Sequence, residues 1–412
     1  MNIKIARFVD FYIGIPICFF LSIWDKIFRF IFRPNPNRPV KRILFIELSE
    51  MGSTVIAYPS IQRMITLYPN AELFFLIFKK NEESVSLLNI IPTKNILTIR
   101  DNSSLVFFLD TMKYILFCLN NKIDTVFDLE LFSRVSTILS YCSRAQVIVG
   151  FHKHTAEGLY RGSLLTHNVY YNDNIHMVYN FYALTEACAG NHTWLLKKEI
   201  PKNFIKLPRV DFNSNRLKYY KDLLGDKRKI LVLNPNSGPL LPIRNWGVEN
   251  FADVACYAEE KLKMKIIVVG LADAKLDAAY ILSRIRNKNS IIDLTGKTES
   301  IYDLLHVFQI SDIFLTNDSG SAHFAALTDI YNLVIFGPET PGLYKPLSSK
   351  TIPIYSNYLC SPCLTARNHR NTLCKDNLCQ KSITPEKINN LLDQLVREAE
   401  NGTPYDREIT YG

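Results

Sequence analysis

The chain has 412 residues, of which 48% are hydrophobic and 21% are charged, and its formal net charge is +9 at pH 7. A chain of this length exceeds one ordinary hydrophobic core, so we expect two domains of about 150–200 residues. The composition excludes a disordered chain, and the positive charge favours anionic partners such as nucleotides, phosphorylated sugars or acidic lipid headgroups. No zinc-finger, homeodomain or RNA-recognition signature accompanies that charge, so we expect no nucleic acid partner.

The first forty residues (1–40) predict a membrane-associated anchor that ends in a proline-rich linker. Residues 11–24 form an apolar run, which Gly14 and Pro16 interrupt and which is shorter than the roughly 20 residues of a membrane span. Basic residues flank the run on both sides: Lys4, Arg7, Lys26, Arg29, Arg33, Arg38, Lys41 and Arg42. Anionic headgroups attract such flanks, so the pattern favours a helix that lies in, or dips into, the cytoplasmic leaflet. A single span and an amphipathic helix docked on the globular body are the alternatives.

Apolar strands alternate with amphipathic helices in two later stretches, 41–205 and 229–384. The strands expected in the first stretch are 42–48, 73–78, 96–99 and 125–129. Those expected in the second are 229–233, 265–269, 291–294, 313–316 and 332–336. Near-continuous apolar strands are typical of a parallel sheet that helices cover on both faces. The sequence therefore predicts an α/β protein of two doubly wound, Rossmann-like domains that face a cleft, with a linker at 206–228 and a C-terminal helix and tail at 385–412.

The segment 317–321 follows a buried strand and precedes a helix that is expected to begin near Ala322. Its small residues allow backbone N–H groups to approach a ligand, and a helix N-terminus adds partial positive charge. This combination predicts a site for a phosphate or diphosphate. As alternatives, Asp318 caps the helix and His323 is an ordinary packed imidazole.

Other strand ends of the same domain also carry small, polar or basic residues. Candidate ligand-binding residues at these ends are Asn236, Ser237, Arg244, Thr295 and Gly296. Parallel strands bring their carboxyl ends to one edge, so we expect these residues to line a pocket for a nucleotide diphosphate. Asp273 is a candidate for binding the ribose, and a carboxylate that only stabilises a helix N-terminus is the equal alternative.

In this order, the segments resemble glycosyltransferase family 9, the bacterial lipopolysaccharide heptosyltransferase family. The matching motifs are the loop 48–53, the Thr295-Gly296 turn, the segment 317–320 with His323, Ala325 and Ala326, and the turn 336–340. The resemblance covers about residues 41–390. It implies a GT-B fold, an inverting mechanism without a catalytic metal, and a donor held by the carboxy-terminal domain. It also implies a final helix that packs back across the amino-terminal domain.

Residue by residue, the resemblance implies that Ser319, Gly320 and Ser321 contact the diphosphate and that Asp318 and His323 shape that site. Where the family often has Lys before Trp, Arg244 stands nearest, with Asn245 between it and Trp246. Arginine is a chemically suitable substitute, because its guanidinium binds phosphate oxygens in a bidentate manner.

One departure concerns the catalytic base, which the resemblance places at the end of the loop 48–53 as an Asp. This sequence has Ser53 there, and a serine hydroxyl alone cannot take the acceptor's proton near neutral pH. The loop carries Glu50, and Glu47 precedes it, so we expect Glu50 to be the base, with Glu47 next. Asp128 and Glu130, at another strand end, are further options. The remaining alternative is that the loop carboxylates are structural and transfer activity has been lost.

Four cysteines fall within twenty residues: Cys360, Cys363, Cys374 and Cys379. Their spacing is compatible with a tetrahedral zinc site, which would be structural, since the family's chemistry needs no metal. A cluster of reduced thiols is the alternative. The polar and basic segment 150–161 either faces an anionic acceptor or forms a solvated loop.

Together these features predict an inverting glycosyltransferase at the cytoplasmic face of the bacterial inner membrane. It would move a heptose or similar sugar from a nucleotide diphosphate donor, with ADP-heptose as the first candidate, to a lipid-linked glycan such as the lipopolysaccharide core. The second hypothesis is a catalytically impaired homologue that binds nucleotide sugars within an assembly. A nicotinamide-dependent Rossmann enzyme is disfavoured, since neither opening strand is followed by a Gly-x-Gly-x-x-Gly fingerprint.

Overall fold

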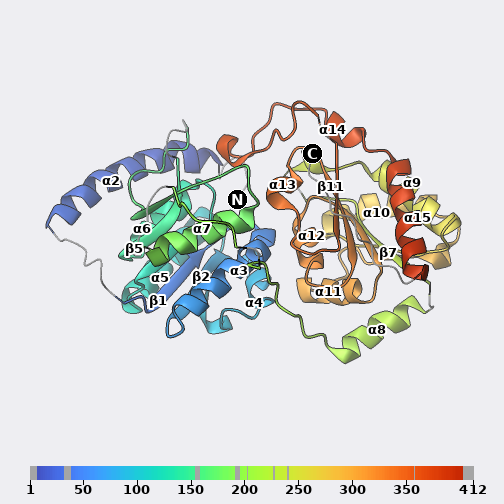
Figure 1. The fold of residues 1–412 in the computed structure, drawn as a ribbon, viewed down its shortest axis with the longest axis horizontal. Helices are drawn as coiled ribbons and strands as arrows, with labels where there is room; N and C mark the ends of the chain where they lie inside the picture. The colour runs from blue at the N-terminus through green and yellow to red at the C-terminus, as the bar shows by residue number, and fades with distance from the viewer. Residues whose placement is uncertain are drawn as a thin grey trace. The chain divides into compact units, whose positions relative to one another are not determined.

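The computed structural model describes residues 7–31, 39–153, 158–190, 195–201, 203–225, 228–238, 241–356 and 358–401. The chain divides after Leu207 into two compact units. Each unit contains one six-stranded sheet with helices on both faces (Figure 1). The pairing within both sheets is parallel, which confirms the predicted doubly wound α/β class.

The sheet of the first unit has the strand order β3-β2-β1-β4-β5-β6. Its strands are β1 (Arg42–Ile46), β2 (Glu72–Phe78), β3 (Ile96–Ile99), β4 (Thr125–Asp128), β5 (Val147–His152) and β6 (His167–Tyr170). The helices are α3 (Met51–Leu67), α4 (Glu83–Ser86), α5 (Ser104–Asn120), α6 (Arg134–Cys142) and α7 (Met177–Gly190), with short 3-10 turns at Lys79–Asn81 and Thr93–Asn95. The order reverses between β1 and β4, so the loops after these two strands adjoin each other at the carboxyl edge.

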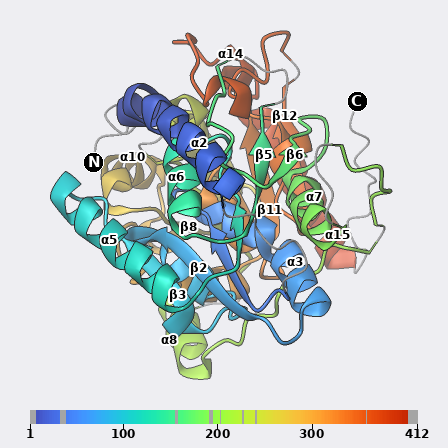
Figure 2. The ribbon, with the colours of Figure 1, turned by 90° about the vertical axis from the view of Figure 1, so that its left-hand side faces the viewer.

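The helices of the first unit form two groups. Helix α3 packs against α4 and α7, whereas α6 packs against α5 and the amino-terminal helix α2 (Gly14–Ile31). Right-handed crossovers that run in opposite directions from the point of reversal place the two groups on opposite faces of the sheet. Figure 2 views the unit from the side on which α2 and α5 lie.

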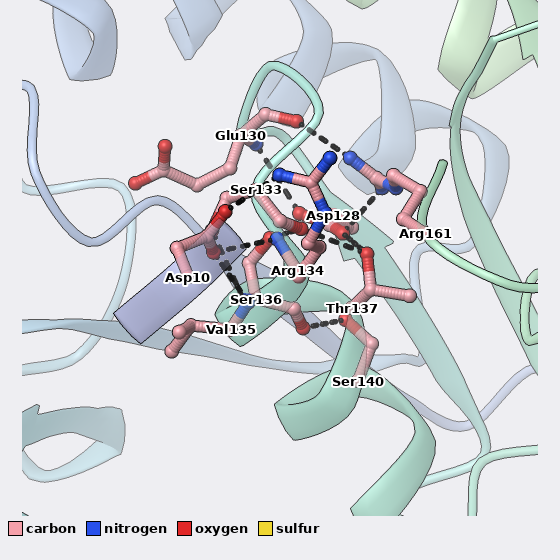
Figure 3. Close-up of polar contacts among 10 residues, drawn as sticks. All are labelled: Asp10, Asp128, Glu130, Ser133, Arg134, Val135, Ser136, Thr137, Ser140 and Arg161. Carbon is pink, nitrogen blue, oxygen red and sulfur yellow. Dashed lines mark hydrogen bonds and ion pairs between the residues drawn. The ribbon is translucent and has the colours of Figure 1, made fainter. Parts of the chain in front are cut away.

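The amino-terminal segment folds as a π-helical turn, η1 (Val9–Ile13), that continues into helix α2 (Gly14–Ile31). It docks on α6 through Asp10, whose Oδ1 accepts hydrogen bonds from the backbone N–H groups of Arg134 and Val135 at 2.8 and 3.0 Å (Figure 3). Its Oδ2 pairs with the Arg134 guanidinium at 3.0 Å. A Cβ at Gly14 would lie 2.8 Å from the Arg134 Cβ, so the close approach requires glycine there.

The docked helix that was an alternative in the sequence is therefore present. Among the helices of the described residues, none is long and apolar enough to span a membrane. The predicted proline-rich linker falls mostly outside the described residues.

The sheet of the second unit has the strand order β12-β11-β10-β7-β8-β9. Its strands are β7 (Ile230–Asn234), β8 (Lys265–Val268), β9 (Ile291–Asp293), β10 (Ile313–Asn317), β11 (Tyr331–Phe336) and β12 (Thr351–Tyr355). The helices are α8 (Ser214–Leu224), α9 (Val248–Glu260), α10 (Lys275–Arg284), α11 (Ile301–Gln309), α12 (Gly320–Ala325), α13 (Pro341–Tyr344), α14 (Leu378–Lys381) and α15 (Pro385–Asn401). The 3-10 turns are η4 (Pro242–Arg244), η5 (Ala272–Ala274), η6 (Lys288–Ser290) and η7 (Ala366–Asn368).

Helix α8 lies within the range that was expected to be only a linker. Asp303 of α11 receives the Arg216 guanidinium at 2.7 Å and the Tyr220 hydroxyl at 2.6 Å, so α8 is part of the second unit.

The final helix, α15, packs against α9 of the second unit (Figure 1). Ile388, Leu392 and Leu395 are buried in the core of that unit, and the Tyr257 hydroxyl of α9 bonds Asp393 at 2.9 Å. The expectation that this helix packs back across the first domain is therefore wrong for its apolar face. Helix α15 has a single apolar face, and its packing on α9 covers that face.

Candidate functional site

The predicted anion-binding turn follows β10, where Thr316, Asn317, Asp318 and Ser319 are all buried. Helix α12 begins at Gly320 rather than at Ala322, and its N-cap residue is Ser319, without a side-chain cap. The helix has only six residues, so its dipole is small and side chains must supply most of the site's charge. Asp318 does not cap the helix, which removes the structural alternative for this residue.

Arg244 approaches the turn from the loop after β7. Its Nη1 donates to the Asp318 carboxylate at 3.2 Å. Its backbone is held in place because the Trp246 N–H donates to Asn317 Oδ1 at 2.9 Å and the Gln380 side chain donates to the Arg244 carbonyl at 2.7 Å. Bonds to Asp318 and Asn317 therefore hold Arg244 and its loop beside the turn, and the bond from Gln380 fixes the Arg244 backbone from α14.

Two buried nitrogen atoms, Arg244 Nε and the nearby His323 Nδ1, have no hydrogen-bond partner among the residues that the structure describes. An unpaired buried polar group destabilises the fold by about 1–3 kcal/mol, so such groups in a native protein are expected to meet a ligand or an ordered water. Arg244 Nε is a donor, and one tautomer of neutral histidine donates from Nδ1, so an anion would satisfy both.

The charges in this cluster are strongly perturbed. Burial, together with the Arg244 charge, lowers the pKa of His323 to about 4, so the imidazole is neutral at pH 7. Burial raises the pKa of Asp318, and the pair with Arg244 opposes that rise. Perturbed titratable groups that converge on a strand end are typical of a functional site.

Glu339, in the turn after β11, belongs to the same cluster and was not among the predicted site residues. Burial and the nearby Asp318 carboxylate raise its pKa well above the ordinary value, while Arg244 opposes the shift. Its side chain is buried and lies 3.3 Å from the Arg370 guanidinium, although neither oxygen has a hydrogen bond of good geometry. The sequence did carry a signal for this residue. The family motif at this turn is Phe-Gly-Pro-Thr, whereas this chain has Glu339 between Pro338 and Thr340.

Ser319 and Ser321 form a chain of hydroxyls that leads toward β7. Ser319 Oγ lies 2.9 Å from Ser321 Oγ, which accepts from Asn234 Nδ2 at 2.9 Å. Asn234, which ends β7, was not predicted as a site residue. The ends of β7 and β10 are thus joined, as parallel pairing requires.

Asn236 and Ser237 shape their own loop. Asn236 Oδ1 accepts from the Gly238 N–H at 2.7 Å, and the Ser237 hydroxyl donates to Asn245 Oδ1 at 2.6 Å. These bonds hold the loop that carries Arg244, so Asn236 and Ser237 stabilise the position of that loop.

Thr295 and Gly296 lie at the end of β9, beside the loop after β8. The Gly296 N–H donates to the Gly270 carbonyl at 2.8 Å. A Cβ at Gly296 would meet Ala272 at 3.3 Å, and its φ of +68° also favours glycine. Asp273 follows Ala272 and is exposed at the start of η5, so no described contact joins it to the Arg244 cluster.

In the first unit, Ser53 and Glu50 lie at the start of α3. The Ser53 hydroxyl donates to Glu50 Oε2 at 2.8 Å, which places a carboxylate next to the position where the family motif has its Asp. Glu50 is half-buried, whereas Glu47 is almost fully buried. Of the two predicted catalytic candidates, Glu50 is therefore the more accessible.

Glu130 and Asp128 are engaged in supporting this loop. Glu130 Oε1 accepts from the backbone N–H groups of Leu48 and Ser49 at 2.9 and 3.0 Å and from the Ser49 hydroxyl at 2.9 Å. The Asp128 carboxylate is fully buried and pairs with Arg161 at 2.6 Å (Figure 3). Arg161 is itself buried, so it does not extend from the 150–161 segment toward an acceptor; residues 154–157 of that segment lie outside the described residues.

The four clustered cysteines gather in one region around Cys379. Burial raises the pKa of the Cys379 thiol, and the thiols of Cys363, Cys360 and Cys374 raise it further. Across the described part of the chain, no group of three or more His, Cys, Asp or Glu side chains is arranged to hold a metal ion. The zinc site stays a prediction.

Comparison with known proteins identifies the class to which this fold and site belong. Residues 119–373 match the model of glycosyltransferase family 9 (heptosyltransferase), so the chain belongs to this family. Over 176 residues it is 28% identical to lipooligosaccharide heptosyltransferase 2 of two Campylobacter jejuni strains. These matches cover 42% of this chain and 53% and 54% of the relatives, so the matched part is about half the length of each relative.

Solved structures share the fold at low sequence identity. Escherichia coli ADP-heptose lipopolysaccharide heptosyltransferase II is 16% identical, with a TM-score of 0.66, and the alignment covers 87% of this chain and 99% of that one. A family 9 glycosyltransferase of Veillonella parvula gives a TM-score of 0.68 at 16% identity, with 87% and 98% coverage. E. coli heptosyltransferase WaaC with ADP gives 0.62 at 13% identity, with 86% and 99% coverage. These likenesses confirm the predicted GT-B class of paired Rossmann-like domains.

The buried imidazole of His323 makes a prediction about stability against pH. Its pKa in the folded protein, about 4, is below the ordinary 6.5, so the unfolded chain binds more protons between these values. This contribution to stability is complete above pH 6.5 and is lost as the pH falls toward 4, a change on the order of 3 kcal/mol. We expect His323→Gln to flatten the fall in the free energy of unfolding, measured by urea denaturation between pH 7 and 4.5. An equal slope in the variant and the wild type would contradict the neutral, buried imidazole.

Proposed function

We propose that this protein is an inverting glycosyltransferase that moves a heptose or similar sugar from a nucleotide diphosphate donor to a lipid-linked glycan such as the lipopolysaccharide core. Membership of family 9 and the heptosyltransferase relatives support this activity. Two of the structures with the same fold contain ADP or ADP-2-deoxy-2-fluoro heptose, which makes ADP-heptose the first candidate for the donor. Because such an acceptor is embedded in lipid, we place the enzyme at the cytoplasmic face of the bacterial inner membrane.

The observation that carries the proposal is the set of buried, unpartnered groups around Arg244. A diphosphate between Arg244 and the 318–321 turn would accept from Arg244 Nε and from His323 Nδ1, both of which lack partners among the described residues. A neutral His323 can donate one hydrogen bond without adding a second buried positive charge. The Asp318 carboxylate keeps the guanidinium oriented, and the short turn allows close approach of the phosphate oxygens.

The leaving group in this reaction is the nucleoside diphosphate, which gains negative charge as the glycosidic bond breaks. A fixed cation at that position stabilises the transition state more than the ground state, and it does so in a site from which water is largely excluded. Arg244 therefore serves both binding and departure of the diphosphate.

The acceptor hydroxyl must lose its proton as it attacks the anomeric carbon, and we assign this proton to Glu50. The hydrogen bond from Ser53 orients the Glu50 carboxylate, which is only half-buried. Glu130 holds the same loop through its bonds to Leu48 and Ser49, so the base would be attached to a rigid support. No metal is needed in this scheme.

Donor binding is tested by replacing Arg244 with methionine, which retains most of the side-chain volume but removes the charge. We expect the affinity for ADP, measured by isothermal titration calorimetry, to fall by about 10- to 100-fold, since a charge-assisted hydrogen bond contributes about 1.5–3 kcal/mol. Arg284→Met is the matched control, because Arg284 lies on α10 and pairs only with exposed partners. Equal affinities for wild type and Arg244→Met would reject the proposed diphosphate site.

Transfer is tested with ADP-heptose and a detergent-solubilised acceptor that lacks the terminal heptose. We expect Glu50→Gln to lower the rate of product formation by about 10²–10⁴-fold, the usual contribution of a general base, with donor affinity unchanged. Glu47→Gln should have a smaller effect. In the double variant Glu50→Gln/Ser53→Asp, a carboxylate at the family position should restore part of the rate.

Nuclear magnetic resonance of the product's anomeric centre would show whether configuration inverts. If the wild type binds ADP-heptose tightly and transfers it to no acceptor, the impaired sugar-nucleotide-binding homologue is the correct function, and the Ser53 replacement explains it.

For the cysteine cluster we retain a structural zinc site, which would hold residues 360–379 and take no part in transfer. Protein purified under reducing conditions should then contain about one zinc per chain by elemental analysis, and Cys363→Ser should lose it and melt at a lower temperature. If the wild type contains no zinc and melts at the same temperature as Cys363→Ser, the zinc site is rejected and the cysteines are a group of reduced thiols.

A further inference from the structure

Helix α2 packs its polar side against the first unit and exposes its apolar side, which is the reverse of an ordinary surface helix. The side that faces the first unit carries small and polar residues, namely Gly14, Cys18, Ser22 and Asp25, all of them buried. Ser22 Oγ accepts from the Ser163 N–H at 2.8 Å and donates to the Cys18 carbonyl at 2.6 Å. This row of small and polar residues docks the helix together with the Asp10–Arg134 pair, and the Arg134 guanidinium also lies 5.3 Å from the centroid of the Phe11 ring.

The apolar side chains of this segment point outward instead. The large hydrophobic residues that are exposed are Phe8, Phe11, Tyr12, Ile13, Ile17, Phe19, Phe20, Ile23, Trp24 and Ile27. Phe20 is 67% exposed and Trp24 is 57% exposed. Soluble monomers rarely expose apolar patches this continuous, so the surface requires a partner.

Helix α5 repeats the arrangement. Its exposed apolar residues are Leu105, Phe108, Leu109, Met112, Leu116 and Leu119, which recur at helical spacing along one side. Leu105 is 69% exposed and Phe108 is 59% exposed. Helices α2 and α5 both pack against α6, so they cover the same side of the first unit (Figure 2).

The distribution of charge over α2 and α5 indicates which kind of partner covers their exposed apolar side chains. Asp10 and Asp25 are the acidic residues among positions 1–42 and Asp110 is the acidic residue of α5. Asp10 pairs with Arg134, Asp110 pairs with Arg100, and Asp25 is buried. The side chains of Lys26 and Lys113 are exposed.

We infer that α2 and α5 together form a docking surface for an anionic lipid bilayer, in which both helices lie parallel to the membrane plane. Exposed Phe, Leu and Ile side chains enter the boundary of the acyl chains, and Tyr12 and Trp24 suit the headgroup level. Outward lysines meet anionic headgroups, while every acidic side chain of the two helices faces the protein. The choice of lipid as occupant rests on the proposed function, in which the acceptor glycan is membrane-bound.

The surface is tested by flotation of the full-length protein with vesicles of phosphatidylcholine alone or with 30% phosphatidylglycerol. We expect binding to the anionic vesicles, and a decrease of at least about tenfold in the partition coefficient for Phe20→Gln/Trp24→Gln and, separately, for Leu105→Gln/Phe108→Gln. Leu195→Gln/Leu276→Gln is the matched control, because both leucines are exposed elsewhere, and it should bind like the wild type. Lys26→Glu/Lys113→Glu should weaken binding to anionic vesicles only.

Three results would overturn the inference. The first is wild-type protein that does not float with either vesicle, and the second is a loss of binding by the α2 variant with none by the α5 variant. The third is a stable dimer in sedimentation that the α5 substitutions dissociate, which would assign α5 to a second copy of the chain instead. ADP affinity, measured on the same variants, separates this test from that of the proposed function: vesicle binding without ADP binding rejects the donor site alone, and the reverse rejects the membrane surface alone.

Discussion

Parallel pairing of the strands is the constraint on which the rest of this structure depends. In each sheet it directs the carboxyl ends of all six strands to one edge, and the loops that follow must lie together there. Residues as distant in sequence as Asn234, Arg244 and Ser321 meet at this edge in the second unit because β7 and β10 are neighbours. In the first unit the same geometry brings Glu130 beneath the loop that follows β1.

At this edge the second unit retains polar groups that a purely structural arrangement would have paired. Arg244 Nη1 donates to Asp318, whereas its buried Nε has no hydrogen-bond partner among the described residues. His323 is neutral because protonation would add another charge beside Arg244. A site of this kind is less stable than a fully paired core would be, and binding of the proposed anionic donor would recover the difference.

The first unit contains two close ion pairs whose arginines are buried: Asp128 with Arg161 at 2.6 Å, and Asp10 with Arg134 at 3.0 Å. These pairs are mainly positional, since desolvation offsets much of the attraction between buried charges. The first holds the strand end beneath the Glu50 loop, and the second determines which side of α2 faces the protein and which faces outward.

The sequence alone determined the class of the fold and the position of the 317–321 turn, because these follow from local patterns of apolar strands and small residues. It also presented Arg244 as the candidate phosphate-binding residue, through the resemblance to the family motif. It also located Glu50 as a carboxylate near Ser53, although the hydrogen bond between them depends on the start of α3. Strand β12, helix α8 as part of the second unit, and the packing of α15 on α9 were decided by tertiary structure, since short or amphipathic segments carry no record of which surface they cover. The same applies to Glu339 and Arg161, whose roles arise from burial beside a charge, and to α2 and α5: an apolar side chain has the same identity in a sequence whether it faces a core or the outside, and only packing decides between them.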